Sequence, residues 1–380
     1  MNLGIDASNI RAGGGVTHLV ELLRAADPPT HGFDRVIVWG GSATLERIDD
    51  RYWLEKRHDA LLDGSLLHRV FWQRFRLGTL ARHAAIDLLF VPGGSAATGM
   101  KPMVAMSQNL LPFEWAELRR FGWSVMTAKG LLLRATQGRT FRKAAGVIFL
   151  SEYARRAVLR VVSDLPPAHA TVSHGVNPRF ATVPRKQRLS SEFTEKSPCR
   201  VVYLSAIDPY KHQRNVARAV AQLRAEGVHL ALTLAGPEGR AVKELRDELR
   251  RLDQNADFIS YAGDIPYETV HELYASADIG VFASSCETFG LILLEMMSAG
   301  LPIACANRSA MPEILGAAGL YFDPEQPAEI ASAIRLLIES PSVRSEKADA
   351  AFNRAKAFTW QRCAEETFLF LSDTAKRSAA

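Results

Sequence analysis

The best single indicator of the fold is the segment Ser284-Ser285-Cys286-Glu287-Thr288-Phe289-Gly290-Leu291-Ile292-Leu293-Leu294-Glu295. Before it, residues 278–283 form a short apolar run that is typical of a strand buried in a parallel sheet. After the turn, residues 291–299 favour a helix, which the sequence Gly300-Leu301-Pro302 ends. The pattern therefore predicts a strand-to-helix turn at the carboxyl edge of an α/β sheet, where ligands bind.

A helix that begins at such a turn presents unpaired backbone N–H groups and the positive end of its dipole. Both features suit an anionic group such as a diphosphate. Glu287 lies in the turn and Glu295 in the helix. Two glutamates at this spacing also occur by chance on helix surfaces, so the pair gains meaning only from the preceding strand and from the Phe289-Gly290 sequence between them.

The composition predicts an ordinary soluble protein with two domains. A chain of 380 residues is long for one hydrophobic core, and its 47% hydrophobic and 23% charged residues are typical of globular proteins. The four cysteines have no metal-ligand spacing, so we expect a reduced, cytoplasmic setting and no metal site. No apolar run reaches the ~18 residues of a membrane-spanning helix, and the N-terminus lacks a signal-peptide pattern.

Positive charge is concentrated in the first half of the chain. Residues 51–143 contain 15 Lys and Arg but only 6 Asp and Glu, together with several aromatic residues. Basic and aromatic segments are typical of contact with an anionic membrane surface. Nucleic acid attracts the same charge, but we expect no nucleic-acid partner. The alternative is a solvated basic face above buried aromatic side chains.

A glycine-rich loop follows the first predicted strand, residues 3–6. Gly13, Gly14 and Gly15 allow positive φ angles or a close approach of the backbone to a ligand, and a helix is predicted over residues 17–25. The loop does not match the dinucleotide-binding fingerprint, because His18 stands where Gly or Ala is expected. We expect Gly14 and Gly15 to face a phosphate or sugar; a plain tight turn is the alternative.

Strand and helix patterns alternate along both halves of the chain, which is typical of doubly wound parallel sheets. Asn109 follows one of these strands and is a candidate residue of the acceptor side, although Asn is also a common turn residue. Further predicted strands are residues 36–39, 88–91, 103–106, 147–150 and 171–173 in the first half, and residues 201–204, 230–235, 259–261, 279–283, 303–306 and 320–322 in the second.

The polar, aperiodic segment 184–198 predicts an interdomain linker. It divides the chain into an N-terminal domain of residues 1–183 and a C-terminal domain of residues 199–358. Residues 359–380 are predicted to form a helix that returns to the first domain. We therefore expect two Rossmann-like, doubly wound α/β domains that face each other across a ligand-binding cleft.

Further candidate residues follow the strands of the second half. Lys211 lies in the loop after the strand 201–204, where its ammonium could neutralise the charge of a departing phosphate. An exposed surface lysine is the alternative. Gly236 and Gly263 each follow a predicted strand, where a glycine permits close approach to a flat ligand such as a base.

Together these motifs resemble those of the retaining, nucleotide-sugar-dependent glycosyltransferases of family 4, also called glycosyl transferases group 1, which have the two-domain GT-B fold. The resemblance covers most of the second domain and scattered points of the first. Besides Glu287-x7-Glu295 with its internal Phe289-Gly290, it rests on Pro209-Tyr210-Lys211, Tyr274-Ala275-Ser276-Ala277-Asp278, Ala299-Gly300-Leu301-Pro302, Pro312-Glu313-Ile314, His174-Gly175-Val176-Asn177 and Gly13-Gly14-Gly15.

The resemblance implies roles for individual residues. Glu287 would contact the donor sugar and Lys211 the phosphate, which makes them the expected catalytic residues, and Glu295 would hold the ribose hydroxyls. One departure is Ser205-Ala206, where the family often has Gly-Arg, so a second cation on the diphosphate is missing there. The full expected donor-binding set is Gly14, Gly15, Ser205, Gly236, Asp264, Ile265, Phe289, Gly290, Leu291 and Glu295.

The resemblance also implies a function. The chain would move a sugar from a nucleotide-diphosphate donor, GDP- or UDP-linked with mannose as a candidate sugar, to a hydroxyl of a glycan or lipid-linked acceptor in bacterial surface polysaccharide or lipopolysaccharide synthesis. We expect no cofactor and no metal, and a cytoplasmic location at the inner face of the membrane. Two alternatives remain: a sugar-nucleotide epimerase of the same fold, and a non-catalytic module that binds a membrane or a partner.

Overall fold

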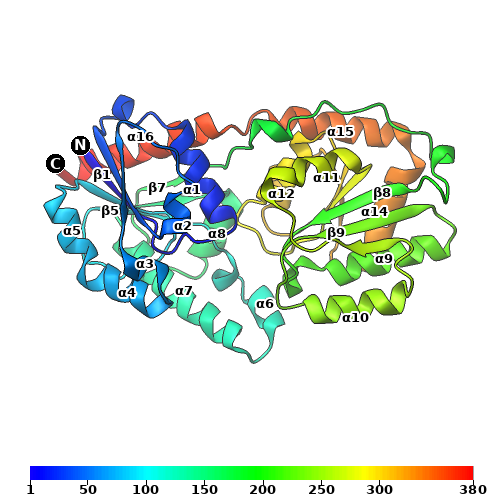
Figure 1. The fold of residues 1–380 in the computed structure, drawn as a ribbon, viewed down its shortest axis with the longest axis horizontal. Helices are drawn as coiled ribbons and strands as arrows, with labels where there is room; N and C mark the ends of the chain where they lie inside the picture. Colours follow the sequence, from blue (N-terminus) through cyan, green and yellow to red (C-terminus); the bar gives the residue numbers. More distant parts are fainter. Residues whose placement is uncertain (380) are drawn as a thin grey trace. The chain divides into compact units, whose positions relative to one another are not determined.

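The computed structural model describes residues 1–379, which form two compact units (Figure 1). Unit 1 consists of Met1–Gly175 and the C-terminal segment from Phe358, and unit 2 consists of Val176–Ala357. Each unit contains one β-sheet in which all paired strands are parallel. The predicted fold class, two doubly wound α/β sheets, is confirmed. That the two domains face each other across a cleft stays a prediction.

The sheet of unit 1 has seven strands, and its order reverses between β1 and β4. Such a reversal opens a crevice at the carboxyl ends of the two strands, where α/β proteins bind ligands. Along the sheet the strands are β3 (Leu54–His58), β2 (Arg35–Gly40), β1 (Asn2–Asp6), β4 (Leu88–Val91), β5 (Met103–Ser107), β6 (Gly146–Phe149) and β7 (His169–Thr171).

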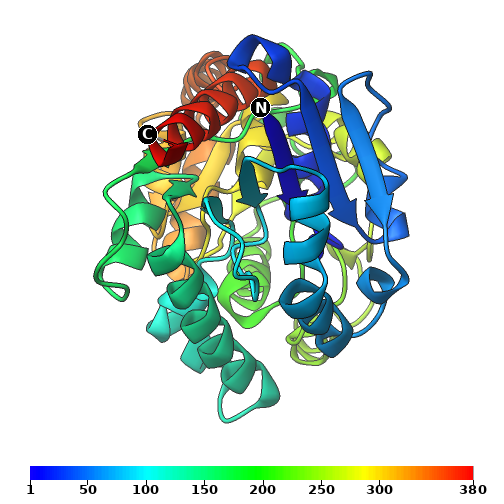
Figure 2. The same ribbon diagram turned by 90° about the vertical axis from the view of Figure 1, so that its left-hand side faces the viewer.

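The central strands of unit 1 are apolar because helices cover both faces of the sheet. Every residue of β4 and β6 is buried, as expected for parallel strands without a solvent face. The long helix α16 packs beside α1 and carries the C-terminus onto unit 1 (Figures 1 and 2). The helices of unit 1 are α1 (Gly14–Ala25), α2 (Ser42–Leu45), α3 (Ala60–Asp63), α4 (Leu66–Phe75), α5 (Leu77–His83), α6 (Trp115–Leu118), α7 (Val125–Lys143), α8 (Glu152–Leu159) and α16 (Trp360–Ala379), with 3-10 turns η1 (Pro28–His31), η2 (Leu111–Phe113) and η3 (Arg119–Phe121).

The sheet of unit 2 has six strands, and its order reverses between β8 and β11. The loops after these two strands therefore flank the crevice of this sheet. Along the sheet the strands are β10 (Ile259–Tyr261), β9 (Leu230–Ala235), β8 (Cys199–Leu204), β11 (Ile279–Phe282), β12 (Ile303–Ala306) and β13 (Leu320–Phe322).

The helices of unit 2 follow the strands in the alternation that the sequence predicts. They are α9 (Gln213–Ala225), α10 (Val242–Leu252), α11 (Val270–Ser276), α12 (Leu291–Ser298), α13 (Met311–Leu315), α14 (Pro327–Glu339) and α15 (Pro341–Ala355), with 3-10 turns η4 (Pro178–Phe180), η5 (Ser190–Glu192), η6 (Pro209–Lys211) and η7 (Tyr267–Thr269).

The predicted linker, residues 184–198, lies within unit 2. Its Arg185 donates hydrogen bonds to Ala275 O at 3.1 Å and to Oδ1 of the buried Asp278 at 2.8 Å. The buried Arg344 donates to Gln187 Oε1 at 3.2 Å. The polar side chains that indicated a linker thus form ion pairs and hydrogen bonds within unit 2. The chain passes from unit 1 to unit 2 at Gly175–Val176, whereas the first domain was predicted to end at residue 183.

Three elements depart clearly from what the sequence predicts. The helix expected from residue 17 begins at Gly14, because Gly13 with φ 64° already forms the turn before it. The strand expected at 171–173 is β7, at His169–Thr171. Strand β3 was not predicted, since its sequence is mostly charged and it lies at the edge of the sheet.

Candidate functional site

Lys211 and Glu287 meet at the carboxyl edge of the unit 2 sheet, where the strand order reverses. Lys211 ends η6 after β8, and Glu287 lies in the loop between β11 and α12. The Lys211 ammonium donates to Oε1 of Glu287, and the two side chains are only 10% and 18% exposed. The structure thus brings together the two residues predicted to be catalytic.

The charge of Lys211 is maintained by its partner. Burial is the largest single effect and disfavours the ammonium, but the Glu287 carboxylate together with Tyr210 and Tyr203 raises the pKa of Lys211 above its ordinary value. The rings of Tyr210 and Phe282 lie 5.0 Å and 5.9 Å from Nζ, within cation–π distance. Lys211 is therefore a permanent positive charge at this edge in the neutral pH range.

The loop that carries Lys211 is held by hydrogen bonds on both sides. The buried Tyr203 hydroxyl donates to Lys211 O at 2.6 Å. Ser285 N donates to Tyr210 O at 2.9 Å, and Ser285 Oγ lies 2.9 Å from His212 Nε2. Because these bonds tie the loop after β8 to the loop after β11, the position of the ammonium is fixed by the fold of unit 2.

The turn before α12 holds the backbone of Glu287 and leaves the helix start without a side-chain cap. Glu287 N donates to Ser309 Oγ at 2.9 Å, and Ser309 Oγ donates to Glu287 O at 2.7 Å. Gly290 has φ 92°, and a Cβ there would lie 2.7 Å from Cε of Met311, so only glycine fits. Gly290 also has no side chain to accept from the first-turn N–H groups of α12, which suits a helix start that receives an anion.

Glu295 is the second glutamate of the motif and is more deeply buried than its predicted role suggests. It is 2% exposed on the almost wholly apolar helix α12. Burial raises its pKa to about 8, while hydrogen bonds from Tyr267 and Tyr274 act in the opposite direction. The Tyr274 hydroxyl lies 3.4 Å from Glu295 Oε2. Its role as a ribose ligand stays a prediction.

The other predicted donor-binding residues of unit 2 lie around the same sheet edge. Gly236 was expected to let the backbone approach a ligand closely, but it packs against the backbone of Ser205 instead. A Cβ at Gly236 would lie 2.2 Å from Ser205 O. Ser205 Oγ accepts from Gln213 Nε2 at 2.8 Å. Asp264 is exposed and Ile265 half-buried in the loop after β10, the outermost strand. Phe289 is buried, so only its backbone can meet a ligand, and Leu291 is half-buried at the first turn of α12.

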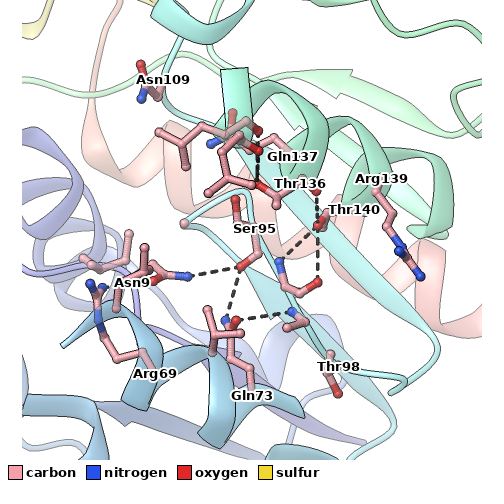
Figure 3. Close-up of a pocket in the computed structure, with 18 of the residues that line it drawn as sticks. Asn9, Arg69, Gln73, Ser95, Thr98, Asn109, Thr136, Gln137, Arg139 and Thr140 are labelled. Atoms are coloured by element: carbon pink, nitrogen blue, oxygen red, sulfur yellow. Dashed lines mark hydrogen bonds between the residues drawn. The ribbon is translucent and has the colours of Figure 1, made fainter. Parts of the chain in front are cut away.

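Gly14, Gly15 and Asn109 belong to unit 1, apart from the other candidates. Gly15 and Asn109 line a pocket of about 960 Å³ at the carboxyl ends of β1 and β4, the reversal point of this sheet. Nothing lies within 4 Å of a Cβ built at Gly14. The structure therefore divides the predicted donor set between the units, and Gly15 lines the same pocket as the acceptor-side candidate Asn109, which Figure 3 shows.

A hydrogen-bond network fixes one wall of this pocket. Gln73 Nε2 donates to the buried Asp6 carboxylate at 2.6 Å and to Ser95 O at 3.2 Å. Asn9 Nδ2 donates to the same Ser95 O at 3.3 Å, and Arg69 donates to Asn9 Oδ1 at 3.0 Å. Figure 3 shows the part of this network that joins Asn9, Gln73 and Ser95. The wall is therefore preformed.

The comparison with known families follows this division into units. Residues 184–357, nearly all of unit 2, match the sequence profile of the family described as glycosyl transferases group 1. Unit 2 is a group 1 glycosyl transferase domain. The family resemblance that the Glu287-x7-Glu295 motif indicated is thereby confirmed.

Curated relatives match part of the chain. The chain is 27% identical to O-antigen chain mannosyltransferase B of Escherichia coli over 237 residues. The matched region covers 58% of each protein. It is 31% identical over 185 residues to the GDP-mannose-dependent alpha-(1-6)-phosphatidylinositol dimannoside mannosyltransferase of Mycobacterium tuberculosis, covering 48% of this chain and 46% of that protein. The chain thus spans about half the length of the curated relatives it matches.

Solved structures match the fold over the whole chain. The structure of HepE of Anabaena in complex with UDP and glucose has a TM-score of 0.72 at 20% identity and covers 98% of this chain and 100% of that one. Sucrose-phosphate synthase of Thermosynechococcus elongatus has a TM-score of 0.77 at 16% identity, with both chains fully covered. At these identities the likeness establishes the fold, which is that of the GT-B glycosyltransferases.

Several residues around the group 1 site were not singled out from the sequence. Ser309, which has φ 56°, accepts a hydrogen bond from the backbone N–H of Glu287. The two residues are 22 positions apart in sequence, and no sequence pattern indicates this contact. Arg179, from η4, stacks 4.0 Å from the ring centre of Tyr267, beside Glu295. In the part of the chain that the structure describes, no cluster of His, Cys, Asp and Glu is arranged to hold a metal ion, and no helix is long and apolar enough to span a membrane.

Proposed function

We propose that this chain is a retaining glycosyltransferase that moves a sugar from a nucleotide-diphosphate donor to an acceptor hydroxyl. The observation that carries the proposal is the buried Lys211–Glu287 pair beside the start of α12, at the reversal point of a group 1 domain. A cation and a helix start suit the diphosphate, and a carboxylate between them suits the sugar hydroxyls.

In the proposed reaction, Lys211 stabilises the diphosphate as it departs. Negative charge grows on the leaving oxygen in the transition state, so a fixed ammonium contributes more there than in the ground state. The first-turn N–H groups of α12 would add to this stabilisation. The diphosphate competes with Glu287 for Lys211, which releases the carboxylate to accept hydrogen bonds from the sugar.

Glu287 is proposed to orient the sugar and not to attack it. Its backbone is held by Ser309 on both the N–H and the C=O side, which restricts how far the side chain can move. The departing phosphate would take the proton of the acceptor hydroxyl on the same face of the sugar, which gives retention without a glycosyl-enzyme adduct. A phosphate that accepts this proton leaves no role for a carboxylate base.

The donor that we propose is GDP-mannose, with UDP-linked sugars as the alternative. The support is the names of relatives that match at 27–31% identity, two of which are mannosyltransferases and one of which is GDP-mannose-dependent. We further propose that the acceptor is a glycan or lipid-linked saccharide of a bacterial surface polysaccharide, since one relative acts in O-antigen synthesis by its name. The enzyme would work in the cytoplasm at the inner face of the membrane.

Two linked assays test the proposal. In a thermal-shift panel of UDP, GDP, ADP and their common sugars, GDP-mannose should stabilise the protein most, by about 2.7 kcal/mol at a hundred times Kd. Product analysis with donor and acceptor should then show transfer with the donor's anomeric configuration. No stabilisation by any nucleotide contradicts a glycosyltransferase, and an epimerised sugar with donor alone supports an epimerase instead.

A further inference from the structure

The pocket of unit 1 is lined by five cations and no carboxylate. Arg69 is half-buried, whereas the others are exposed, and within residues 1–379 none of the five forms an ion pair. Other cations of this unit do form ion pairs, as in Arg76–Asp59 and Arg120–Glu117. The five cations of the pocket are Arg69, Arg74, Lys129, Arg139 and Lys143.

Three buried polar atoms of the pocket have no hydrogen-bond partner in the described chain: Arg69 Nε, Ser95 Oγ and Gln137 Oε1. Gln137 is 4% exposed and faces the pocket from α7 (Figure 3). Buried polar groups are rarely left unpaired in folded proteins, because each costs free energy. The orphan donors and acceptors on opposite walls therefore indicate a polar ligand between them.

Three of the five cations, including Lys129 and Lys143, lie on α7, and the other two lie on α4. Lys129, Thr136, Thr140 and Lys143 recur at intervals of three, four or seven residues, which places them along one side of the helix. Thr140 Oγ1 also accepts from Ala96 N at 3.1 Å, which ties this face to the loop after β4. The positive charge of the pocket is thus carried by two helices, α4 and α7.

Apolar side chains continue from the pocket onto the surface. Leu66 and Val70 of α4 and Leu132 of α7 line the pocket and are exposed. Beyond them, exposed large apolar side chains follow on the same two helices: Leu67, Phe71, Phe75, Val125 and Leu131. Such a run of exposed apolar residues costs free energy in water unless an apolar partner covers it.

We propose that this pocket binds the phosphate of a lipid-linked acceptor, with the lipid chain along Leu66, Val70 and Leu132. The inference rests on the proposed function and specifies its acceptor: a saccharide joined through phosphate or diphosphate to an apolar chain. Charge complementarity selects the phosphate, the orphan polar atoms receive the saccharide, and the α4–α7 apolar residues select the chain. A free sugar phosphate would leave those apolar residues uncovered.

The size of the pocket agrees with this ligand. A volume of about 960 Å³ lies at the upper end of small-ligand sites, enough for a phosphorylated saccharide but not for a long lipid chain. The chain must therefore leave the pocket, and its exit lies where the apolar residues of α4 and α7 continue onto the surface. This also places the membrane beside α4 and α7.

Isothermal titration calorimetry with three probes tests the site without donor or catalysis. The probes are decyl phosphate below its micelle concentration, inorganic phosphate, and 1-decanol below its solubility limit, which has the chain without the charge. Decyl phosphate should bind at least about ten-fold more tightly than either other probe, because only it has both parts. If inorganic phosphate binds as tightly, the lipid assignment is overturned.

A charge-matched pair of variants locates the binding. The double variant Lys129→Gln/Lys143→Gln removes two pocket cations, and Arg82→Gln/Arg134→Gln removes two cations of the same unit that do not line the pocket. The first should weaken decyl phosphate about ten-fold or more, and the second less than about two-fold. Equal losses in both variants overturn the pocket as the site, because they indicate unspecific charge.

The same titrations separate this inference from the proposed function. Both double variants should bind GDP-mannose with the wild-type affinity, since none of the four residues belongs to unit 2. Nucleotide binding without selective decyl phosphate binding overturns the acceptor inference alone. Selective decyl phosphate binding without nucleotide binding supports the pocket and contradicts the proposed glycosyl transfer.

Discussion

At the reversal point of the unit 2 sheet, one buried lysine is paired with a carboxylate, whereas the equivalent point of the unit 1 sheet has a pocket with five cations and no carboxylate. The two units have the same kind of sheet and the same crevice. They differ in how the charge at that crevice is balanced. Lys211 is neutralised within the protein by Glu287, whereas the five cations of the unit 1 pocket form no ion pair within residues 1–379.

The difference indicates two modes of anion binding. Under the proposed function, a diphosphate in unit 2 displaces Glu287 from Lys211, so donor binding is coupled to the release of a carboxylate toward the sugar. An anionic ligand of the unit 1 pocket would bind cations that have no carboxylate partner to displace. Such contacts increase the affinity for the ligand and fix its orientation. We therefore expect changes in unit 2 to alter turnover, and changes in unit 1 to alter acceptor affinity.

The largest expected effect is that of Lys211→Met. If Lys211 stabilises the leaving diphosphate as proposed, loss of its ammonium should lower kcat by about 10²- to 10³-fold. Steady-state transfer assays with GDP-mannose measure this loss. The double variant Lys211→Met/Glu287→Gln, which leaves no unpaired buried charge, controls for misfolding and should be as inactive. Turnover within ten-fold of wild type in both would remove Lys211 from the mechanism.

Glu287→Gln should have a smaller effect on turnover. The amide keeps one acceptor and the shape of the side chain but loses the charge-assisted hydrogen bond to the sugar, so kcat should fall about ten- to hundred-fold. The product should keep the donor's configuration, and mass spectrometry should find no glycosyl adduct. Full turnover together with a trapped adduct elsewhere on the protein would show that the sugar is attacked by another group.

The unit 1 variant Lys129→Gln/Lys143→Gln sharpens the comparison. It should raise the KM for a lipid-phosphate acceptor about ten-fold and leave kcat within about two-fold, because it removes binding that ground state and transition state share. A fall in kcat with unchanged KM would place these lysines in the chemical step and contradict the difference drawn between the units.

The last expected effect is on stability and not on catalysis, through Glu295. Burial raises its pKa from 4.5 to about 8, so the native state keeps a proton that the unfolded chain releases. The free energy of unfolding should therefore fall as pH rises between about 4.5 and 8, by up to ~1.4 kcal/mol per unit from this residue. Glu295→Gln cannot ionise and should flatten that slope in urea unfolding. Parallel slopes for variant and wild type would contradict a protonated Glu295.

The second half of the fold was predictable because its strands are apolar runs that end in recognisable turns. Residues 279–283 and the glycine at 290 fall where β11 and the start of α12 are found. The mostly charged strand β3 was not predictable, because an edge strand needs no apolar pattern. The linker was misplaced because arginines that seemed to belong to a solvated segment are bound to Asp278.

The candidate site was predictable where a residue follows a strand directly. Lys211 and Glu287 each follow a central strand of the sheet, so the crevice rule alone brings them together. Burial was not predictable: Glu295 is held by Tyr267 and Tyr274 from other elements. The cationic pocket was indicated only as a local excess of positive charge, because its walls come from segments far apart in sequence.

Isothermal titration calorimetry of GDP-mannose with wild type and Lys211→Met tests the central claim that Lys211 receives the donor diphosphate. Loss of one charge-assisted contact should weaken binding by about ten- to hundred-fold. Arg214→Gln is the control, since Arg214 pairs with Glu248 on α10 and should leave the affinity unchanged. Equal affinities of wild type and Lys211→Met, or no binding by either, would contradict the account.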